Sequence, residues 1–116
     1  MRALVVDDDD AFRTLLVALL AEVADVVEQA ADGDVAVQLA RDLRPDLIVM
    51  DITMPRMDGI SAARAILQVH PSANIVFLSG TETAQKLSEA SAYGVVVGKN
   101  AIDLRAELLA AAAKAQ

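Results

Sequence analysis

The stretch that decides the fold is Leu47-Ile48-Val49-Met50-Asp51, four apolar residues followed at once by a carboxylate. A short apolar run without alternating polar residues is typical of a strand buried on both faces, as in a parallel sheet. Asp51 would then lie at the carboxyl end of that strand. Because open parallel sheets bind ligands at the carboxyl ends of their strands, we expect Asp51 to face a site.

Three other apolar runs also end at polar side chains. The first run of the chain leads directly into four aspartates, Asp7–Asp10. A later run leads into Ser79, which a glycine follows, and the last run is followed after one glycine by Lys99. Since parallel strand ends converge at one edge of a sheet, the sequence predicts a small acidic pocket with one lysine and one hydroxyl.

Strand and helix patterns alternate along the chain. The clearest helical repeat lies between Phe12 and Val23, where apolar residues recur at every third or fourth position. Five strand-then-helix repeats predict an α/β domain. The expected strands are residues 3–7, 25–30, 46–50, 74–78 and 94–98; the later helices are expected at about 34–43, 59–70, 82–92 and 101–114. The helix at 82–92 has a thin apolar stripe, so we expect it to shift most easily.

Size and composition exclude several classes of function. We expect one domain, residues 1–116, with any output domain lying beyond Gln116. The net charge of −7 argues against direct nucleic-acid binding. With no cysteine, no visible signal peptide and no apolar stretch of membrane-spanning length, the expected location is the cytoplasm, without membrane association.

The predicted pocket suits a hard divalent cation. Asp7, Asp8 and Asp51 would repel one another, and one of them would tend to hold a proton unless a cation neutralised the group. All the available ligands are oxygens, which favours Mg²⁺ or Mn²⁺ over zinc. Asp51 could then accept a phosphoryl group as a nucleophile. Lys99 and the Ser79 hydroxyl would neutralise charge on its oxygens.

Each of these residues also has an ordinary structural explanation. An aspartate run after a strand is commonly a helix N-cap with solvated charge. Asp51 or Ser79 alone could belong to a turn, and Lys99 alone could be a surface charge. The argument for a site is that all of them fall at strand ends of one α/β repeat.

The sequence resembles the receiver domain of bacterial two-component response regulators over nearly its whole length. The matching segments are Leu-Val-Val-Asp-Asp (4–8), Arg-Pro-Asp-Leu-Ile-Val-Met-Asp (44–51), Met-Pro-Arg-Met-Asp-Gly (54–59), Phe-Leu-Ser-Gly (77–80) and Lys99. The resemblance implies a doubly wound, flavodoxin-like (βα)5 fold with a five-stranded parallel sheet in the order 2-1-3-4-5.

The resemblance also implies roles for single residues. Asp51 would be the phosphoacceptor, Asp8 a direct metal ligand and Asp7 a ligand acting largely through water. The backbone carbonyl of Thr53 would complete the protein's share of the metal shell, while Ser79 and Lys99 would hold phosphoryl oxygens. Arg13, His70 and Met57 are expected to be surface, loop and packing residues.

Two features depart from the family pattern. The family usually has proline after its lysine, with a cis peptide, but here Asn100 follows Lys99. A cis bond before a residue other than proline costs about 2.5–4 kcal/mol, so we expect a trans bond. The usual aromatic of the fifth strand is also missing, since Tyr93 precedes that strand. The spacing from Ser79 to Lys99 is slightly short, which predicts a truncated or displaced fourth helix.

The leading interpretation is a receiver that accepts phosphate from a sensor histidine kinase and switches an output module; it is not itself an enzyme, and it could form a homodimer. The first alternative is a Mg²⁺-dependent phosphohydrolase. Many such enzymes place an acidic residue two positions after the nucleophile, but here Thr53 stands there. The second alternative is a degenerate receiver that docks or dimerises without phosphorylation.

Overall fold

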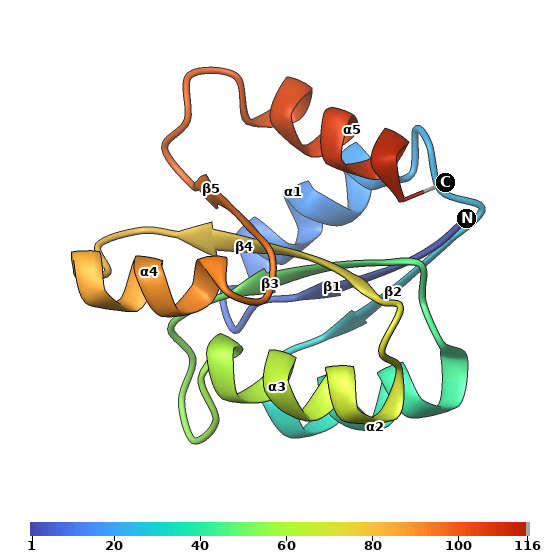
Figure 1. Cartoon of the computed structure of the whole chain (residues 1–116). Helices are drawn as coiled ribbons and strands as arrows, with labels where there is room; N and C mark the ends of the chain where they lie inside the picture. The colour runs from blue at the N-terminus through green and yellow to red at the C-terminus, as the bar shows by residue number, and fades with distance from the viewer. Residues whose placement is uncertain (116) are drawn as a thin grey trace.

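The computed structural model describes residues 1–115, which form a five-stranded sheet with helices on both faces (Figure 1). All strand pairs are parallel and the strand order is β2-β1-β3-β4-β5, as the resemblance implied. The elements in chain order are β1 (Arg2–Val6), α1 (Asp10–Leu20), β2 (Val26–Ala30), α2 (Gly33–Leu43), β3 (Leu47–Asp51), α3 (Gly59–Val69), β4 (Asn74–Ser79), α4 (Ala84–Ser91), β5 (Val95–Gly98) and α5 (Leu104–Lys114).

The strands form the middle layer, and the inner strands β1, β3 and β4 carry apolar side chains on both faces. Alternate residues such as Val6, Met50 and Phe77 belong to the hydrophobic cluster that packs on α2, α3 and α4. Their neighbours, including Val5 and Val49, belong to the cluster beneath α1 and α5. The five residues of β3 are all buried, as expected for the central strand of a parallel sheet.

Side chains at the N-termini decide where the helices begin. The N-cap residues are Asp9, Asp32, Asp58, Thr83 and Asp103, each accepting hydrogen bonds from backbone N–H groups of the first turn. Such caps satisfy N–H groups that have no partner inside the helix. The last helix was predicted from residue 101 but begins at Leu104, because Asp103 caps it.

The fourth helix is the shortest of the five helices in residues 1–115. It was predicted over residues 82–92, but Thr83 caps it and α4 covers only Ala84–Ser91. Within these eight residues, only Ala90 is fully buried. Its weak packing and short length are consistent with the predicted truncation, and α4 is therefore held less by hydrophobic burial than its neighbours.

Two local expectations about the backbone are confirmed. Helix α2 ends where the Arg44-Pro45 pair predicted, with Arg44 in the left-handed region at a φ of 47°. Among residues 1–115 the peptide bonds are trans, including the bond between Lys99 and Asn100.

In the same part of the chain, no helix is both long enough and apolar enough to cross a bilayer.

Candidate functional site

Three carboxylates meet at the carboxyl edge of the sheet. Strands β1 and β3 are neighbours, with Val6 opposite Met50, so the aspartates that follow these residues lie side by side. Asp7, Asp8 and Asp51 each place a carboxylate oxygen within 4.8 Å of the others. Asp7 is fully buried and Asp51 is 5% exposed, whereas Asp8 is exposed to solvent. The predicted convergence of these three side chains is therefore present.

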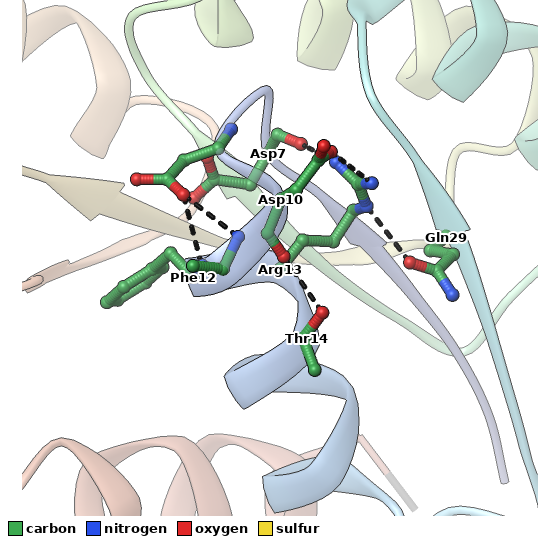
Figure 2. Close-up of polar contacts among 8 residues, drawn as sticks. Asp7, Asp10, Phe12, Arg13, Thr14 and Gln29 are labelled. Carbon is green, nitrogen blue, oxygen red and sulfur yellow. Dashed lines mark hydrogen bonds and ion pairs between the residues drawn. The ribbon is translucent and has the colours of Figure 1, made fainter.

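Backbone and side-chain hydrogen bonds fix the β1–α1 loop (Figure 2). Asp7 Oδ1 accepts a hydrogen bond of 2.9 Å from the Asp9 backbone N–H. Arg13 donates to the Asp7 carbonyl oxygen at 2.8 Å and pairs with Asp10 at 2.6 Å. Arg13 also donates to Gln29 at 2.9 Å, which joins the loop to β2.

The prediction that Arg13 is a surface residue was wrong. Its side chain is only 16% exposed, although its partner Asp10 is 87% exposed. Position 13 lies between apolar residues of an amphipathic helix, and nothing in that pattern signals a guanidinium that folds back over the preceding loop. The aspartate run therefore has two structural roles besides the site: it caps α1 and it anchors Arg13.

Lys99 brings a positive charge into the acidic pocket. Its Nζ lies 3.0 Å from Asp7 Oδ2 and 3.3 Å from Asp51 Oδ2. The Lys99 backbone N–H donates to the Ser79 carbonyl at 2.8 Å, which places the residue at the end of β5. The Nζ also lies 4.7 Å from the centre of the Phe12 ring, a cation–π contact that the sequence did not reveal.

The charge balance of the pocket is unfavourable for the ionised form of Asp51. Burial, reinforced by the negative charge of Asp7, raises the pKa of Asp51 to about 6, although Lys99 opposes the shift. Burial lowers the pKa of Lys99, but its contacts with Asp7 and Asp51 outweigh burial and leave that pKa raised. The expectation that one clustered carboxyl tends to hold a proton agrees with the direction of the Asp51 shift.

The remaining predicted residues lie on the loops around Asp51. Ser79 ends β4, is half-buried, and pairs with Gly98 of β5. A Cβ added at Gly80 would meet nothing within 4 Å, so the space expected beside Ser79 is present. Thr53 lies just after β3, where its hydroxyl donates to Glu82 at 2.6 Å.

Nothing in the sequence pattern indicated that Glu82 contacts the loops beside the site. Its Oε1 accepts a hydrogen bond of 2.7 Å from the Gly80 backbone N–H, while Oε2 accepts the Thr53 hydroxyl. Glu82 is half-buried although it belongs to a polar loop. Only the tertiary structure brings the loops after β3 and β4 together around this carboxylate.

The donor set fits a hard divalent cation. The ligand atoms offered by Asp7, Asp8 and Asp51 are all carboxylate oxygens, which Mg²⁺ prefers. Asp7 Oδ2 is buried and has no hydrogen-bond partner within residues 1–115, although it forms an ion pair with Lys99 Nζ at 3.0 Å. The oxygen thus keeps a lone pair for a metal or its water. A carbonyl ligand from Thr53 stays a prediction.

Two other residues lie where the sequence predicted them. His70 ends α3 and its Nε2 is 2.8 Å from the Pro45 carbonyl oxygen. Met57 packs against the core on the α2 and α3 side, and a Cβ at Gly33 would touch its side chain. The Asp58-Gly59 pair forms the predicted turn into α3, with Asp58 as its N-cap.

The fold is a doubly wound α/β sheet with a cluster of carboxylates at its carboxyl edge, and comparison with known proteins assigns its family. Residues 3–107 match the response regulator receiver domain family. The chain therefore belongs to the receiver domains of response regulators, the proteins of two-component signalling.

Similar proteins extend this assignment. Over 83 residues the chain is 48% identical to a protein-glutamate methylesterase/protein-glutamine glutaminase from Alkalilimnicola ehrlichii, covering 70% of this chain and 21% of that protein. The response regulator domain of Thermotoga maritima CheB gives a TM-score of 0.84 at 30% identity, covering 99% of this chain and 95% of that chain. The receiver domain of the Arabidopsis thaliana histidine kinase CKI1, complexed with Mg²⁺ and BeF₃⁻, gives a TM-score of 0.80 at 27% identity, covering 97% and 89%. The chain covers 21–39% of the length of the first curated relatives it matches.

Proposed function

We propose that Asp51 accepts a phosphoryl group from a sensor histidine kinase, in a reaction that depends on Mg²⁺ or Mn²⁺, and that this switches an output module. The observation that carries the proposal is the position of Asp51 at the end of β3. It lies beside Asp7 and Asp8, with carboxylate oxygens within 4.8 Å of one another, and 3.3 Å from Lys99 Nζ. The CKI1 receiver, a structural neighbour, was solved with Mg²⁺ and BeF₃⁻, which supports the same class of ligands here.

The transfer forms one bond and breaks one. A carboxylate oxygen of ionised Asp51 attacks phosphorus, and the bond from phosphorus to the donor's imidazole nitrogen breaks. The electron pair stays on that nitrogen, and Asp51 becomes an acyl phosphate. With a pKa of about 6, Asp51 is mostly ionised at neutral pH and can act as the nucleophile.

The neighbouring residues would neutralise the charge of the phosphoryl group and keep it in position. Asp7, Asp8, Asp51 and the Thr53 carbonyl would hold the cation, which neutralises charge on the phosphoryl oxygens when bound. Lys99 lies 3.3 Å from Asp51 and supplies a second positive charge next to the acceptor oxygen. Ser79, at the end of the adjacent strand, would donate its hydroxyl to a phosphoryl oxygen. Such transfer depends mainly on positioning and charge neutralisation.

The test is labelling by a small-molecule phosphodonor with Mg²⁺. We expect wild-type protein to incorporate phosphate and D51N to incorporate none, because the amide is not a nucleophile. The control D42N removes an equivalent charge at an exposed position on α2 and should label like wild type. Labelling of D51N would show that another residue is the acceptor.

The rest of the signalling pathway is also part of this proposal. We infer a cytoplasmic location and a sensor histidine kinase as phosphodonor. We also infer an attached or separate output module that responds to the phosphorylation. The methylesterase and response regulator relatives are longer proteins, which supports an arrangement in which a receiver controls another module.

One observation favours the second candidate, a receiver that docks without phosphorylation. Strand β5 is Val-Val-Val-Gly and contains no aromatic side chain. Tyr93, before the strand, accepts a hydrogen bond of 3.0 Å from Arg64, which fixes its ring at α3. If Mg²⁺ and beryllofluoride bind but leave α4 and β5 unchanged by amide NMR, the docking function is favoured.

A further inference from the structure

The half-buried Arg13 has no role in the phosphoryl transfer proposed above. It stands in the first turn of α1, and its side chain is only 16% exposed. The guanidinium donates to three acceptors (Figure 2): the Asp7 carbonyl oxygen at 2.8 Å, Gln29 Oε1 at 2.9 Å and Asp10 Oδ1 at 2.6 Å. Because a guanidinium is planar and its donors have a fixed geometry, these contacts define its position.

One of the three contacts falls on the peptide bond that joins two of the candidate metal ligands. The Asp7 carbonyl and the Asp8 N–H belong to one planar unit, which also contains the Cα atoms of both residues. Strand β1 ends at Val6, so this unit lies outside the strand. Arg13 holds it at the carbonyl oxygen, while the N–H of Asp7 donates to the Ala30 carbonyl at 3.2 Å. The orientation of Asp7 relative to Asp8 therefore depends on Arg13.

Gln29 holds Arg13 from the side of the sheet. It belongs to the edge strand β2, opposite Val5 of β1, and accepts from Arg13 Nε. The third partner, Asp10, is 87% exposed, and an ion pair with so exposed a partner contributes little. The contacts with Asp7 and Gln29 are thus the ones that set the position of the guanidinium.

We propose that Arg13 is a positioning residue of the cation site: it holds the Asp7–Asp8 peptide so that both carboxylates face one cation, and it thereby sets the affinity for Mg²⁺. The inference rests on the proposed function, because it takes Asp7, Asp8 and Asp51 as the cation ligands. Partners that orient metal ligands in this way typically change metal affinity about 10- to 100-fold when they are removed.

The sign of the effect separates positioning from a simple charge effect. Arg13 is a cation beside an acidic cluster, so its charge alone repels Mg²⁺, and removal of that charge should tighten metal binding. Release of the Asp7–Asp8 peptide should instead weaken metal binding, because the two carboxylates would have to be ordered when the cation binds. Arg13→Met keeps most of the apolar stem and removes every donor, so it sets the two effects against each other.

The test is Mg²⁺ binding in the absence of phosphodonor, followed through the amide NMR signals of Asp8 and Asp51. We expect R13M to bind Mg²⁺ about tenfold more weakly than wild type. Q29L, at an exposed position, should weaken binding by a smaller factor. It should add nothing in the R13M background, because both substitutions act through one guanidinium.

The matched control is R105M, which makes the same substitution at another arginine that joins two elements. Arg105 of α5 pairs with Glu22, which lies beyond the C-terminal end of α1, whereas the candidate site lies at the N-terminal end. We expect R105M to bind Mg²⁺ like wild type. Phosphate incorporation gives a second readout: in R13M the half-saturating Mg²⁺ concentration should rise, while the rate at saturating Mg²⁺ should stay near that of wild type.

Equal or tighter Mg²⁺ binding in R13M would overturn the positioning role. If R13M does not fold, the milder Q29L decides, and wild-type affinity in Q29L would overturn it. A further loss of affinity in the double variant would overturn the part given to Gln29. Absence of Mg²⁺ binding in wild type would instead overturn the cation site of the proposed function.

Discussion

At the scale of single residues, Asp51 is destabilising when it is ionised in the metal-free protein. Its pKa is raised to about 6, whereas an unfolded aspartate titrates at about 3.9. The folded protein therefore binds more protons than the unfolded chain between these values, so the stability contribution of Asp51 falls as pH rises through this window.

The D51N variant tests this charge balance. In the presence of EDTA we expect it to be more stable than wild type by about 1 to 3 kcal/mol near neutral pH, with the difference shrinking toward about pH 4. Urea unfolding at the two pH values measures it. A D51N stability difference that is the same at both pH values would contradict the raised pKa.

A second prediction for a single residue concerns Phe12, whose ring contacts Lys99. Because Lys99 Nζ lies 4.7 Å from the ring centre, F12L keeps the apolar bulk but loses a cation–π contact of about 0.5–1 kcal/mol. We expect F12L to slow phosphate incorporation at Asp51 about two- to fivefold, and F12Y to restore it. Incorporation in F12L at the wild-type rate would show that the ring does not position Lys99.

Residue-level prediction succeeded where a strand end fixes the position of a side chain. Asp7, Asp51 and Lys99 follow apolar runs directly or after one glycine, so parallel register alone brings them together. Arg13 and Glu82 could not be found in this way. Their contacts depend on side-chain rotamers and loop paths, which leave no periodic signal in the sequence.

At the scale of elements, the close approach of α3 to β3 requires glycine at position 59. A Cβ there would overlap the Asp51 backbone carbonyl, which belongs to the last residue of β3 and cannot move without shifting that strand. We expect G59A to lose about 1–3 kcal/mol of stability and also to bind Mg²⁺ more weakly. Chemical unfolding and a metal titration measure the two effects.

Gly94 provides a matched control for this prediction. A Cβ at Gly94 would overlap the Ile75 carbonyl, near the start of β4 and away from the carboxyl edge of the sheet. We expect G94A to be destabilised by a similar amount while its folded fraction binds Mg²⁺ like wild type. Weaker metal binding in G94A and normal binding in G59A would contradict the assignment of the site.

The element pattern was predictable because four of the five strands, all except β2, contain a continuous apolar run and each connection contains a helix-length segment. The predicted strands end within one residue of those observed. Helix starts were less accurate, since Asp103 and Thr83 compete with nearby polar residues as caps. Capping depends on local backbone angles that a hydrophobic pattern does not contain.

At the scale of the whole molecule, cation binding should stabilise the fold by mass action. The repulsion among Asp7, Asp8 and Asp51 is present in the folded protein and largely relieved on unfolding. At a Mg²⁺ concentration of about 100 times Kd, the gain should be about 2.7 kcal/mol. D8N should need a higher concentration for the same gain, whereas D42N should match wild type; thermal unfolding across a Mg²⁺ series measures it. Stability of wild type that does not depend on Mg²⁺ would contradict the metal site.

The central claim is that Asp51 and its neighbours form a phosphoryl-acceptor site coupled to α4. The most direct measurement is an amide NMR titration with Mg²⁺ and then beryllofluoride, which mimics an aspartyl phosphate. We expect Mg²⁺-dependent shifts at Asp8, Asp51 and Ser79 that extend through residues 80–91 and are lost in D51N. An absence of shifts at Asp51 and Ser79 in wild type would contradict the account.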